Sequence, residues 1–330
     1  MSTRVIRWGI IGAGKIAKKF AQDLITLDNT ELYGIASRSL IKANKFASEC
    51  NASIAYGSYE ALALDPHVDA IYVATPHSFH CAHSLLCLKH KIPVLCEKPF
   101  AMNLDEVNEM IQTAKENDTL LMEAMWTAFL PHFNFVEKLI NTKYFGEVLK
   151  LEADFGSHPM YDENSRVFDK SVGGGSLLDI GIYPIFAALS TLGLPNTIEA
   201  KAEVFPNGAD SKCDMVFHYN KAKAYLKSSL VDDTKTEAIF YCEEGIIKIN
   251  GRFHEPTSVL LIDKFGNKEL KSFNYQMIGY SYEIAHFNKL IRQDKTESAI
   301  MSFNRSMALI STLDKVRHII GLGYNKKSAT

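Results

Sequence analysis

The sequence predicts an α/β fold in which a doubly wound parallel sheet is followed by a C-terminal α+β domain on a large, open, mainly antiparallel sheet. Up to about residue 122, short apolar runs alternate with helical patterns, as in parallel strands connected by helices. Longer runs of alternating hydrophobicity follow, which are typical of antiparallel strands with one solvated face. A chain of 330 residues also exceeds one ordinary domain. We therefore expect domains at residues 1–122 and 123–330.

The first domain contains six expected strands with helices between them. Asn103 precedes the last of these helices, and Glu106 completes a capping box three residues later. Six strands in this pattern indicate a Rossmann fold, whose ligand crevice lies at the carboxyl ends of strands one and four. The expected strands are 5–11, 31–37, 53–55, 70–74, 93–96 and 120–122, and the expected helices are 16–27, 40–50, 59–64, 78–89 and 104–116.

The second domain is expected to consist mainly of strands. One helix near residues 176–192 interrupts them, and helices after Tyr280 close the chain. The alternation after residue 145 is compatible with a sheet that exposes one apolar face. The expected strands are 148–155, 197–205, 212–219, 224–230, 237–241, 245–250 and 259–263.

The turn after the first strand has the spacing of a dinucleotide-binding fingerprint, G-x-G-x-x-A. Gly12 suits the tight turn, Gly14 lets the backbone approach a pyrophosphate, and Ala17 lets the following helix pack on the strand. The exposed N–H groups and the positive dipole at the start of the helix then receive the phosphates. The expected cofactor contacts in this turn are Gly12, Ala13, Gly14, Lys15 and Ile16.

The end of the second strand selects between the two nicotinamide dinucleotides. An NAD site places a carboxylate there, about 20 residues after the fingerprint, to bind the ribose 2′-hydroxyl. This chain instead has Ser37 and Arg38, with no acid beside them. The guanidinium can pair with a 2′-phosphate and stack on adenine, so NADP is the favoured cofactor and NAD the less favoured one. The alternative is a solvated arginine at a turn.

Composition argues against several other classes of protein. The sequence is 47% hydrophobic and 22% charged with a formal net charge of −2, which gives no bulk attraction to nucleic acid or to an anionic membrane. No apolar run approaches the ~18 residues of a membrane span, and the N-terminus shows no signal-peptide pattern. We expect a cytoplasmic protein with six free cysteine thiols and no membrane or nucleic-acid partner.

Three histidines, His77, His80 and His83, raise the alternative of a metal-dependent enzyme. On a helix, positions i, i+3 and i+6 drift around the axis, and no acidic or thiolate ligand clusters with them in the sequence. No metal site is therefore expected, and solvated or core-edge histidines are the favoured interpretation.

Three further segments complete the pattern: A-T-P-H-S-F-H at 74–80, L-C-E-K-P at 95–99 and G-G-G-S-L-L-D-I-G-I-Y at 173–183. Together with the glycine turn, they resemble the Gfo/Idh/MocA family (glucose–fructose oxidoreductase/inositol dehydrogenase) over essentially the whole chain. E-K-P is the most specific of these motifs, and D-I-G-x-Y is the next. M-E-A-M-W at 122–126 and the G-E-V…D-F-G pattern at 146–156 resemble the branch of dimeric dihydrodiol dehydrogenases and NADP-dependent D-xylose 1-dehydrogenases.

The resemblance implies a catalytic set of Lys98, Tyr183 and Asp179. Lys98 would polarise the substrate oxygen, Tyr183 would carry the proton, and Asp179 would orient this pair. It also implies a cis bond before Pro99. The residues leave other interpretations open: a surface lysine, a core tyrosine, and a capping box made by Ser176 and Asp179.

The resemblance also implies contacts with the cofactor and the substrate. Glu97 is expected to point away from Lys98 on the alternating strand and to have a structural role as well. Ala128 departs from the branch, which commonly has arginine at this position. The expected cofactor contacts beyond the glycine turn are Ser37, Arg38, Ala74, Thr75, Pro76, His77, His80, Glu97, Lys98 and Trp126, and the expected substrate contacts are Lys98, Trp126, Phe155, Arg166, Asp179, Tyr183 and Tyr280.

The expected function is hydride transfer between NADP and a CH–OH or C=O carbon of a small polyhydroxylated substrate, such as a sugar, a cyclic polyol or a trans-dihydrodiol. The resemblance further implies a homodimer formed through the C-terminal sheet. An alternative from a different class is an NADP-sensing regulatory protein without turnover. The presence of both Lys98 and Tyr183 favours the enzyme, because a sensor has no need of an acid–base pair.

Overall fold

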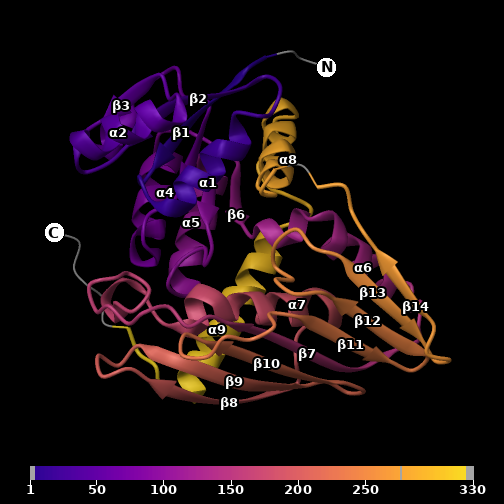
Figure 1. Ribbon diagram of the computed structural model, residues 1–330. Coiled ribbons are helices and arrows are strands. Elements are labelled where there is room, and N and C mark those ends of the chain that lie inside the picture. Colours follow the sequence, from indigo (N-terminus) through magenta and orange to yellow (C-terminus); the bar gives the residue numbers. More distant parts are fainter. Residues whose placement is uncertain (1–3, 276, 325–330) are drawn as a thin grey trace. The chain divides into compact units, whose positions relative to one another are not determined.

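The computed structural model describes residues 4–275 and 277–324, which form two compact units (Figure 1). Unit 1 consists of Met1–Trp126 and Tyr275–Met307, and unit 2 consists of Thr127–Asn274 and Ala308–Thr330. The expected boundary after residue 122 lies close to the first crossing, which follows Trp126. Each expected domain is one continuous segment, whereas the chain returns to unit 1 for Tyr275–Met307.

Unit 1 is built on a six-stranded parallel sheet in the order β3-β2-β1-β4-β5-β6. This order confirms the expected Rossmann fold and places the topological switch point between β1 and β4. Strand β1 reads IRWGII and is almost wholly buried, as a strand covered on both faces must be. The strands are β1 (Ile6–Ile11), β2 (Thr30–Ala36), β3 (Ile54–Tyr56), β4 (Ala70–Val73), β5 (Val94–Glu97) and β6 (Leu121–Ala124).

Three helices of unit 1 begin at residues whose side chains cap them. Asn103 Oδ1 accepts a hydrogen bond from the Glu106 N–H at 3.0 Å, so the expected cap of α5 is confirmed. Ser39 and Ser58 cap α2 and α3 in the same way. The helices are α1 (Lys15–Leu24), α2 (Leu40–Cys50), α3 (Tyr59–Ala63), α4 (His80–Lys89), α5 (Leu104–Glu116) and α8 (Ser281–Arg292), with a 3₁₀ turn η1 (His77–Phe79) before α4.

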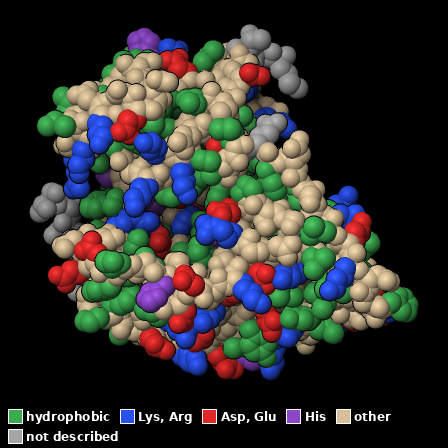
Figure 2. All heavy atoms as spheres, viewed as in Figure 1, with side chains coloured by type: hydrophobic (Ala, Val, Ile, Leu, Met, Phe, Trp, Pro, Cys, Tyr) green, Lys and Arg blue, Asp and Glu red, His purple; other side chains and the backbone are tan. Residues whose placement is uncertain are grey.

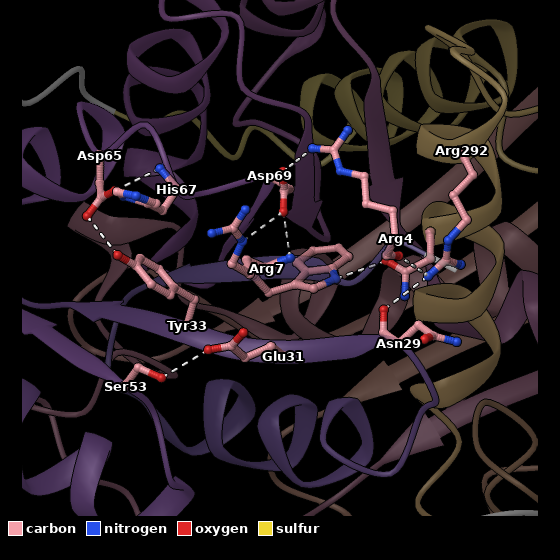
Figure 3. Close-up of polar contacts among 12 residues, drawn as sticks. Arg4, Arg7, Asn29, Glu31, Tyr33, Ser53, Asp65, His67, Asp69 and Arg292 are labelled. Atoms are coloured by element: carbon pink, nitrogen blue, oxygen red, sulfur yellow. Dashed lines mark hydrogen bonds and ion pairs between the residues drawn. The ribbon is translucent and has the colours of Figure 1, made fainter. Parts of the chain in front are cut away.

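Helix α8 explains why the late segment belongs to unit 1. The Trp8 indole N–H donates to Asn288 Oδ1 at 3.0 Å, and the Asn288 amide donates to Thr30 Oγ1 at 2.9 Å. Arg292, near the end of α8, donates to the backbone carbonyl of Asn29 at 3.0 Å (Figure 3). These bonds join α8 to β1 and to the start of β2, across more than 250 residues of sequence.

The start of α8 is capped from a distant part of the chain. Asp23 is fully buried in α1 and accepts hydrogen bonds from the N–H groups of Ile278 at 3.1 Å, Gly279 at 2.8 Å and Ser281 at 3.1 Å. The first N–H groups of a helix have no partner within that helix, and this carboxylate satisfies the one at Ser281 as well as two N–H groups just before the helix. It thereby fixes the segment that carries Tyr280.

Unit 2 is built on an eight-stranded sheet in the order β14-β13-β12-β11-β7-β10-β9-β8, which confirms the expected large, mainly antiparallel sheet. Strands β7 and β10 run parallel, whereas their other neighbours are antiparallel to them. The strands are β7 (Val148–Gly156), β8 (Thr197–Val204), β9 (Asp210–His218), β10 (Lys223–Ser229), β11 (Ala238–Cys242), β12 (Gly245–Ile249), β13 (Val259–Asp263) and β14 (Lys268–Lys271).

The sequence analysis did not anticipate helix α6 or strand β14 in unit 2, nor the short turns η2 and η3. Helix α6 begins with Pro131 at a position that tolerates a missing N–H, and β14 is a short edge strand. Besides α8, the helical elements that begin at residue 126 or later are η2 (Trp126–Phe129), α6 (Pro131–Asn141), η3 (Lys170–Val172), the π-helical turn η4 (Leu177–Gly181), α7 (Ile182–Leu192) and α9 (Phe303–Ile319). The first residues of α9 belong to unit 1. No helix in the described ranges is both long and apolar enough to cross a membrane.

The two faces of the unit 2 sheet differ in character. Leu151, Ala224 and Phe217 are cross-strand neighbours and are fully buried on one face. The opposite face contains an open hollow of about 500 Å³ that charged side chains line as well as apolar ones. The strands alternate apolar residues with charged ones, and both kinds of side chain line this hollow. At the edge of the sheet that β9 and β8 form, acidic and basic side chains are interspersed (Figure 2).

Candidate functional site

The turn between β1 and α1 is shaped to receive a phosphate group. Gly12 has a φ of +104°, and a Cβ atom there would lie 2.6 Å from the Ala74 carbonyl oxygen. Gly14 is the N-cap of α1, and no side chain in the described part of the chain caps this helix. A Cβ atom on Gly14 would meet nothing within 4 Å in the same described part. The N–H groups of the first turn therefore face open space at the positive end of the helix dipole.

The end of β2 places a positive charge at the surface of unit 1. Arg38 is exposed and makes a hydrogen bond with the Tyr59 hydroxyl, while burial raises the pKa of this tyrosine. Ser37 is mostly buried, and its hydroxyl accepts a hydrogen bond from the Ser39 N–H at 3.3 Å. An exposed guanidinium with no acid in the adjoining sequence suits a 2′-phosphate, as the sequence predicted.

Lys98 follows β5 directly and is half-buried in a segment that two carboxylates hold. The expected cis bond between Lys98 and Pro99 is present. The Lys98 N–H donates to Glu97 Oε2 at 3.1 Å, and the Phe100 N–H donates to Glu123 Oε1 at 3.1 Å. Both carboxylates are buried. We call residues 97–100 the lysine loop.

Glu97, in the lysine loop, and Glu123, in β6, are the two acids that hold this loop. Glu97 also accepts a hydrogen bond from the buried Tyr72 hydroxyl. The pKa of Glu123 is raised to about 7, chiefly by burial and with a smaller contribution from the Glu97 carboxylate. Hydrogen bonds with Ser306 and the Phe100 N–H, and the Lys98 ammonium, oppose this shift. Sequence reasoning missed Glu123, and the signal that could have found it is an acid within the otherwise apolar run M-E-A-M-W.

Two expected substrate contacts, Trp126 and Tyr280, meet in unit 1. Their rings stack with centroids 4.5 Å apart and an interplanar angle of 16°. Both side chains are nearly buried, and the carboxylate of Asp23 holds the segment before Tyr280. Aromatic side chains of this kind often line small-molecule sites.

In unit 2 the structure pairs two further expected residues, Arg166 and Asp179. The Arg166 guanidinium donates to Asp179 Oδ1 at 3.1 Å. Asp179 lies in the π-helical turn η4, which leads directly into α7 and Tyr183. Such π turns are rare and occur frequently at functional sites.

The capping-box interpretation of Ser176 and Asp179 is wrong. Ser176 has helical backbone angles, and its hydroxyl donates to Asp210 Oδ2 at 2.7 Å. The Leu177 N–H donates to the same oxygen at 2.6 Å. Asp210 at the start of β9 therefore caps this turn, and burial raises its pKa. Sequence spacing cannot indicate such a cap, because its donor and acceptor are more than 30 residues apart.

Tyr183 packs in an aromatic group with Phe155 and His254. The ring centroid of His254 lies 4.8 Å from that of Tyr183 and 4.2 Å from that of Phe155. The ring of Tyr183 thus has the packing of a core residue. Arg252 is close enough for its charge to interact with the Tyr183 hydroxyl. Sequence reasoning missed His254, since no local pattern sets it apart from other histidines.

Of the remaining expected residues, three lie at the end of β4, and the buried His77 and His80 lie in η1 and at the start of α4; Ala128, where the branch commonly has arginine, lies in η2. Ala74, Thr75 and Pro76 are half-buried, and Ala128 is fully buried. The structure leaves all six cysteines as free thiols. Among the described residues, no group of three or more His, Cys, Asp or Glu side chains could hold a metal ion.

A switch point with an open glycine turn defines unit 1 as a dinucleotide-binding domain of the Rossmann class. Residues 6–125 match a family model described as "Oxidoreductase family, NAD-binding Rossmann fold", and residues 133–248 match one described as "GFO/IDH/MocA C-terminal domain". The chain belongs to the GFO/IDH/MocA family of oxidoreductases.

Similar proteins cover the chain almost end to end. A "Trans-1,2-dihydrobenzene-1,2-diol dehydrogenase" of Xenopus tropicalis is 35% identical over 96% of this chain and 99% of its own length. The "scyllo-inositol 2-dehydrogenase (NADP(+)) IolU" of Bacillus subtilis is 31% identical over 97% and 98%. Among solved structures, KijD10, a 3-ketoreductase from Actinomadura kijaniata in complex with TDP-benzene and NADP, has a TM-score of 0.83 at 25% identity over 95% of this chain and 97% of that one. An aldose-aldose oxidoreductase from Caulobacter crescentus shares the fold, with a TM-score of 0.87 at 19% identity over 96% and 97%.

Proposed function

We propose that this protein is an NADP-dependent oxidoreductase that moves hydride between the nicotinamide and a CH–OH or C=O carbon of a small polyhydroxylated substrate. The observation that carries this proposal is Lys98, held at the carboxyl end of β5 in the domain that contains the open glycine turn. The names of the relatives support the substrate class, because they include a dihydrodiol dehydrogenase and an NADP-dependent inositol dehydrogenase.

The residues of unit 1 fit NADP. The first-turn N–H groups of α1 would bind the pyrophosphate, and Gly14 leaves the room that a phosphate needs. Arg38 would bind the 2′-phosphate, and Ser37 lies beside it. The other proposed contacts are Ala13, Lys15, Ile16, Ala74, Thr75, Pro76, His77, Glu97 and Trp126. The expected contact of His80 is left out, because its side chain is fully buried and both ring nitrogens face backbone carbonyls.

When bound, NADP supplies the hydride acceptor of the oxidative reaction. Tyr183 takes the proton of the substrate hydroxyl, and the Lys98 ammonium stabilises the negative charge that develops on the oxygen. Asp179, paired with Arg166, orients the proton-transfer group. One proton leaves the oxygen and one hydride leaves the carbon, so the alcohol becomes a carbonyl. Trp126, Phe155 and Tyr280 would provide apolar walls for the substrate.

A substrate panel with NADP and NAD tests this function. Inositols, aldoses and a trans-dihydrodiol are offered to the wild type and to the Lys98→Met and Tyr183→Phe variants, while the absorbance of reduced nicotinamide is followed. We expect a preference for NADP and at least ~100-fold slower turnover in each variant, the usual scale for a positioned acid–base group. Tight NADP binding without turnover of any substrate would instead support a sensor.

We also propose a homodimer formed through the outer face of the unit 2 sheet. On this face Lys227 pairs across strands with Asp154 and Asp214, so a patch of both signs lies within one chain. A two-fold axis brings such a patch onto itself and can set each lysine against a carboxylate of the other copy. Light scattering should show a dimer that Tyr225→Asp on this face disrupts. Phe265→Asp, an exposed aromatic position in the β13–β14 turn, should leave it intact.

A further inference from the structure

His80 joins two loops at the carboxyl end of the unit 1 sheet. It is the first residue of α4 and is fully buried. Its Nδ1 lies 2.8 Å from the carbonyl oxygen of Pro99, in the lysine loop, and its Nε2 lies 2.8 Å from the carbonyl oxygen of Thr75, just after β4. Both ring nitrogens therefore face backbone carbonyls.

This arrangement determines how many protons the ring carries. A carbonyl oxygen has no proton and can only accept a hydrogen bond. A neutral imidazole has one N–H, so its second nitrogen would point a lone pair at the other carbonyl oxygen at 2.8 Å. An imidazolium has two N–H groups and donates to both oxygens, each at a normal hydrogen-bond distance.

The bond to Pro99 is a third anchor of the lysine loop. Glu97 accepts from the Lys98 N–H and Glu123 accepts from the Phe100 N–H, so carboxyl groups hold the N–H groups on either side of Pro99. The His80 ring holds the carbonyl that lies between them. Two carbonyl oxygens that can only accept also favour the charged form of the ring, because hydrogen bonds to a charged form stabilise it.

The titratable groups around this ring come from several elements. The ring of His77, in η1, lies 5.7 Å from that of His80. Glu97 and Lys98 lie at the end of β5, Glu123 lies in β6, and each contacts the lysine loop or belongs to it. Groups of both signs thus lie along the loop that His80 holds.

His83 provides an internal comparison one turn further along α4. Its Nδ1 lies 3.0 Å from Thr75 Oγ1, a hydroxyl that can either donate or accept. The pKa of His83 is lowered to about 4, chiefly by burial; Glu60 opposes this shift and the charge of Arg38 adds to it. The same helix thus carries a histidine whose surroundings demand two protons and one whose surroundings favour the neutral ring.

We propose that His80 is a positioning residue: as an imidazolium it ties the lysine loop to the end of β4, and so fixes where Lys98 stands relative to Thr75. Its effect on turnover rests on the proposed function, whereas its charge state does not. The clamp therefore acts through the backbone of the two loops.

Nuclear magnetic resonance of the full chain with ¹⁵N-labelled histidine rings tests the charge state directly. At about pH 8, above the reference pKa of about 6.5, exposed histidines are neutral. We expect one histidine with protons on both nitrogens, and this signal should vanish in His80→Gln and persist in His83→Gln. If the His80→Gln chain does not fold, neutron diffraction of the wild type should show hydrogen on both ring nitrogens. A bare nitrogen on His80 by either method would overturn the proposal.

Turnover supplies the second test. Because a small displacement of a catalytic group can cost up to about 100-fold in rate, we expect His80→Gln to lower kcat by about 10-fold or more. His83→Gln should change it far less. An unchanged kcat in His80→Gln would refute the positioning role. If the wild type turns over no substrate, the proposed function fails, while the ring protons still decide the charge state.

Discussion

Replacing Gly12 and Gly14 with alanine, one at a time, separates the structural and the binding requirements of the dinucleotide turn. At Gly12 the new Cβ atom would lie 2.6 Å from the Ala74 carbonyl oxygen and 2.9 Å from its carbon, at a φ of +104°. A positive φ costs a non-glycine residue about 1–2 kcal/mol, and overpacking costs about 1–3 kcal/mol. We therefore expect Gly12→Ala to destabilise unit 1 by about 2–5 kcal/mol.

Gly14→Ala is the matched control. Gly14 has a φ of −96°, which alanine adopts freely, and the described residues leave its Cβ position open. Its stability should therefore change by about 1 kcal/mol or less, the scale of an N-cap substitution. NADP binding should weaken by about 10-fold or more, because the methyl group occupies the approach of a charge-assisted hydrogen-bond partner.

Tryptophan fluorescence suits this experiment, because the chain has two tryptophans, Trp8 and Trp126, and both belong to unit 1. Urea unfolding followed by this fluorescence measures the stability of unit 1, and a titration with NADPH measures binding. Wild-type stability in Gly12→Ala, or wild-type NADPH affinity in Gly14→Ala, would refute the reasoning about the turn.

Three further predictions concern charge and packing. Arg38→Ala should weaken NADP binding by about 10-fold or more, through the loss of charge-assisted hydrogen bonds, and leave NAD binding nearly unchanged. Lys42→Ala, at an exposed position of α2, should change the binding of neither cofactor. Equal losses for both cofactors in dissociation-constant measurements would contradict the 2′-phosphate assignment. Burial raises the pKa of Glu123 from 4.5 to about 7, so the fold favours the protonated carboxyl. The stability that this preference contributes is fully present below pH 4.5 and is lost as pH rises through about 7. As pH rises across this range, the free energy of unfolding of Glu123→Gln, measured with urea, should increase relative to that of the wild type by up to about 3 kcal/mol. A constant difference between the two at every pH would show that the carboxyl is not protonated in the fold. Gly175→Ala places a Cβ atom 2.1 Å from Asp210 Oδ1, at a φ of +124°. Gly193 also has a positive φ, but a Cβ atom there would meet nothing within 4 Å among the described residues, so Gly193→Ala should lower the thermal stability of unit 2 less than Gly175→Ala. Equal melting temperatures for the two variants would count against the clash.

Local chemistry made parts of the fold predictable from the sequence. The bounds of α2 and α5 match the expected helices 40–50 and 104–116 because a side chain just before each helix caps it. The alternation of strands and helices likewise predicts the Rossmann sheet, since period and connection length are local properties. Helix α6 and edge strand β14 lacked such signals, and β14 contains one apolar residue, Leu270.

Features that depend on distant contacts could not be predicted in this way. The return of Tyr275–Met307 to unit 1 rests on bonds such as Trp8 to Asn288, 280 residues apart. The caps supplied by Asp23 and Asp210 also come from remote parts of the chain. Sequence motifs indicated the candidate site residues, whereas the partners that hold them emerge only in three dimensions. The cytoplasmic location stays a prediction.

Tracing the transferred hydrogen tests the central claim most directly. A polyol substrate carrying deuterium at its CH–OH carbon is incubated with NADP and the wild-type protein, and the product is examined by nuclear magnetic resonance. We predict deuterium at C4 of the reduced nicotinamide on a single face, at a rate that falls at least ~100-fold in Lys98→Met and in Tyr183→Phe. Transfer at the wild-type rate in both variants would contradict the account.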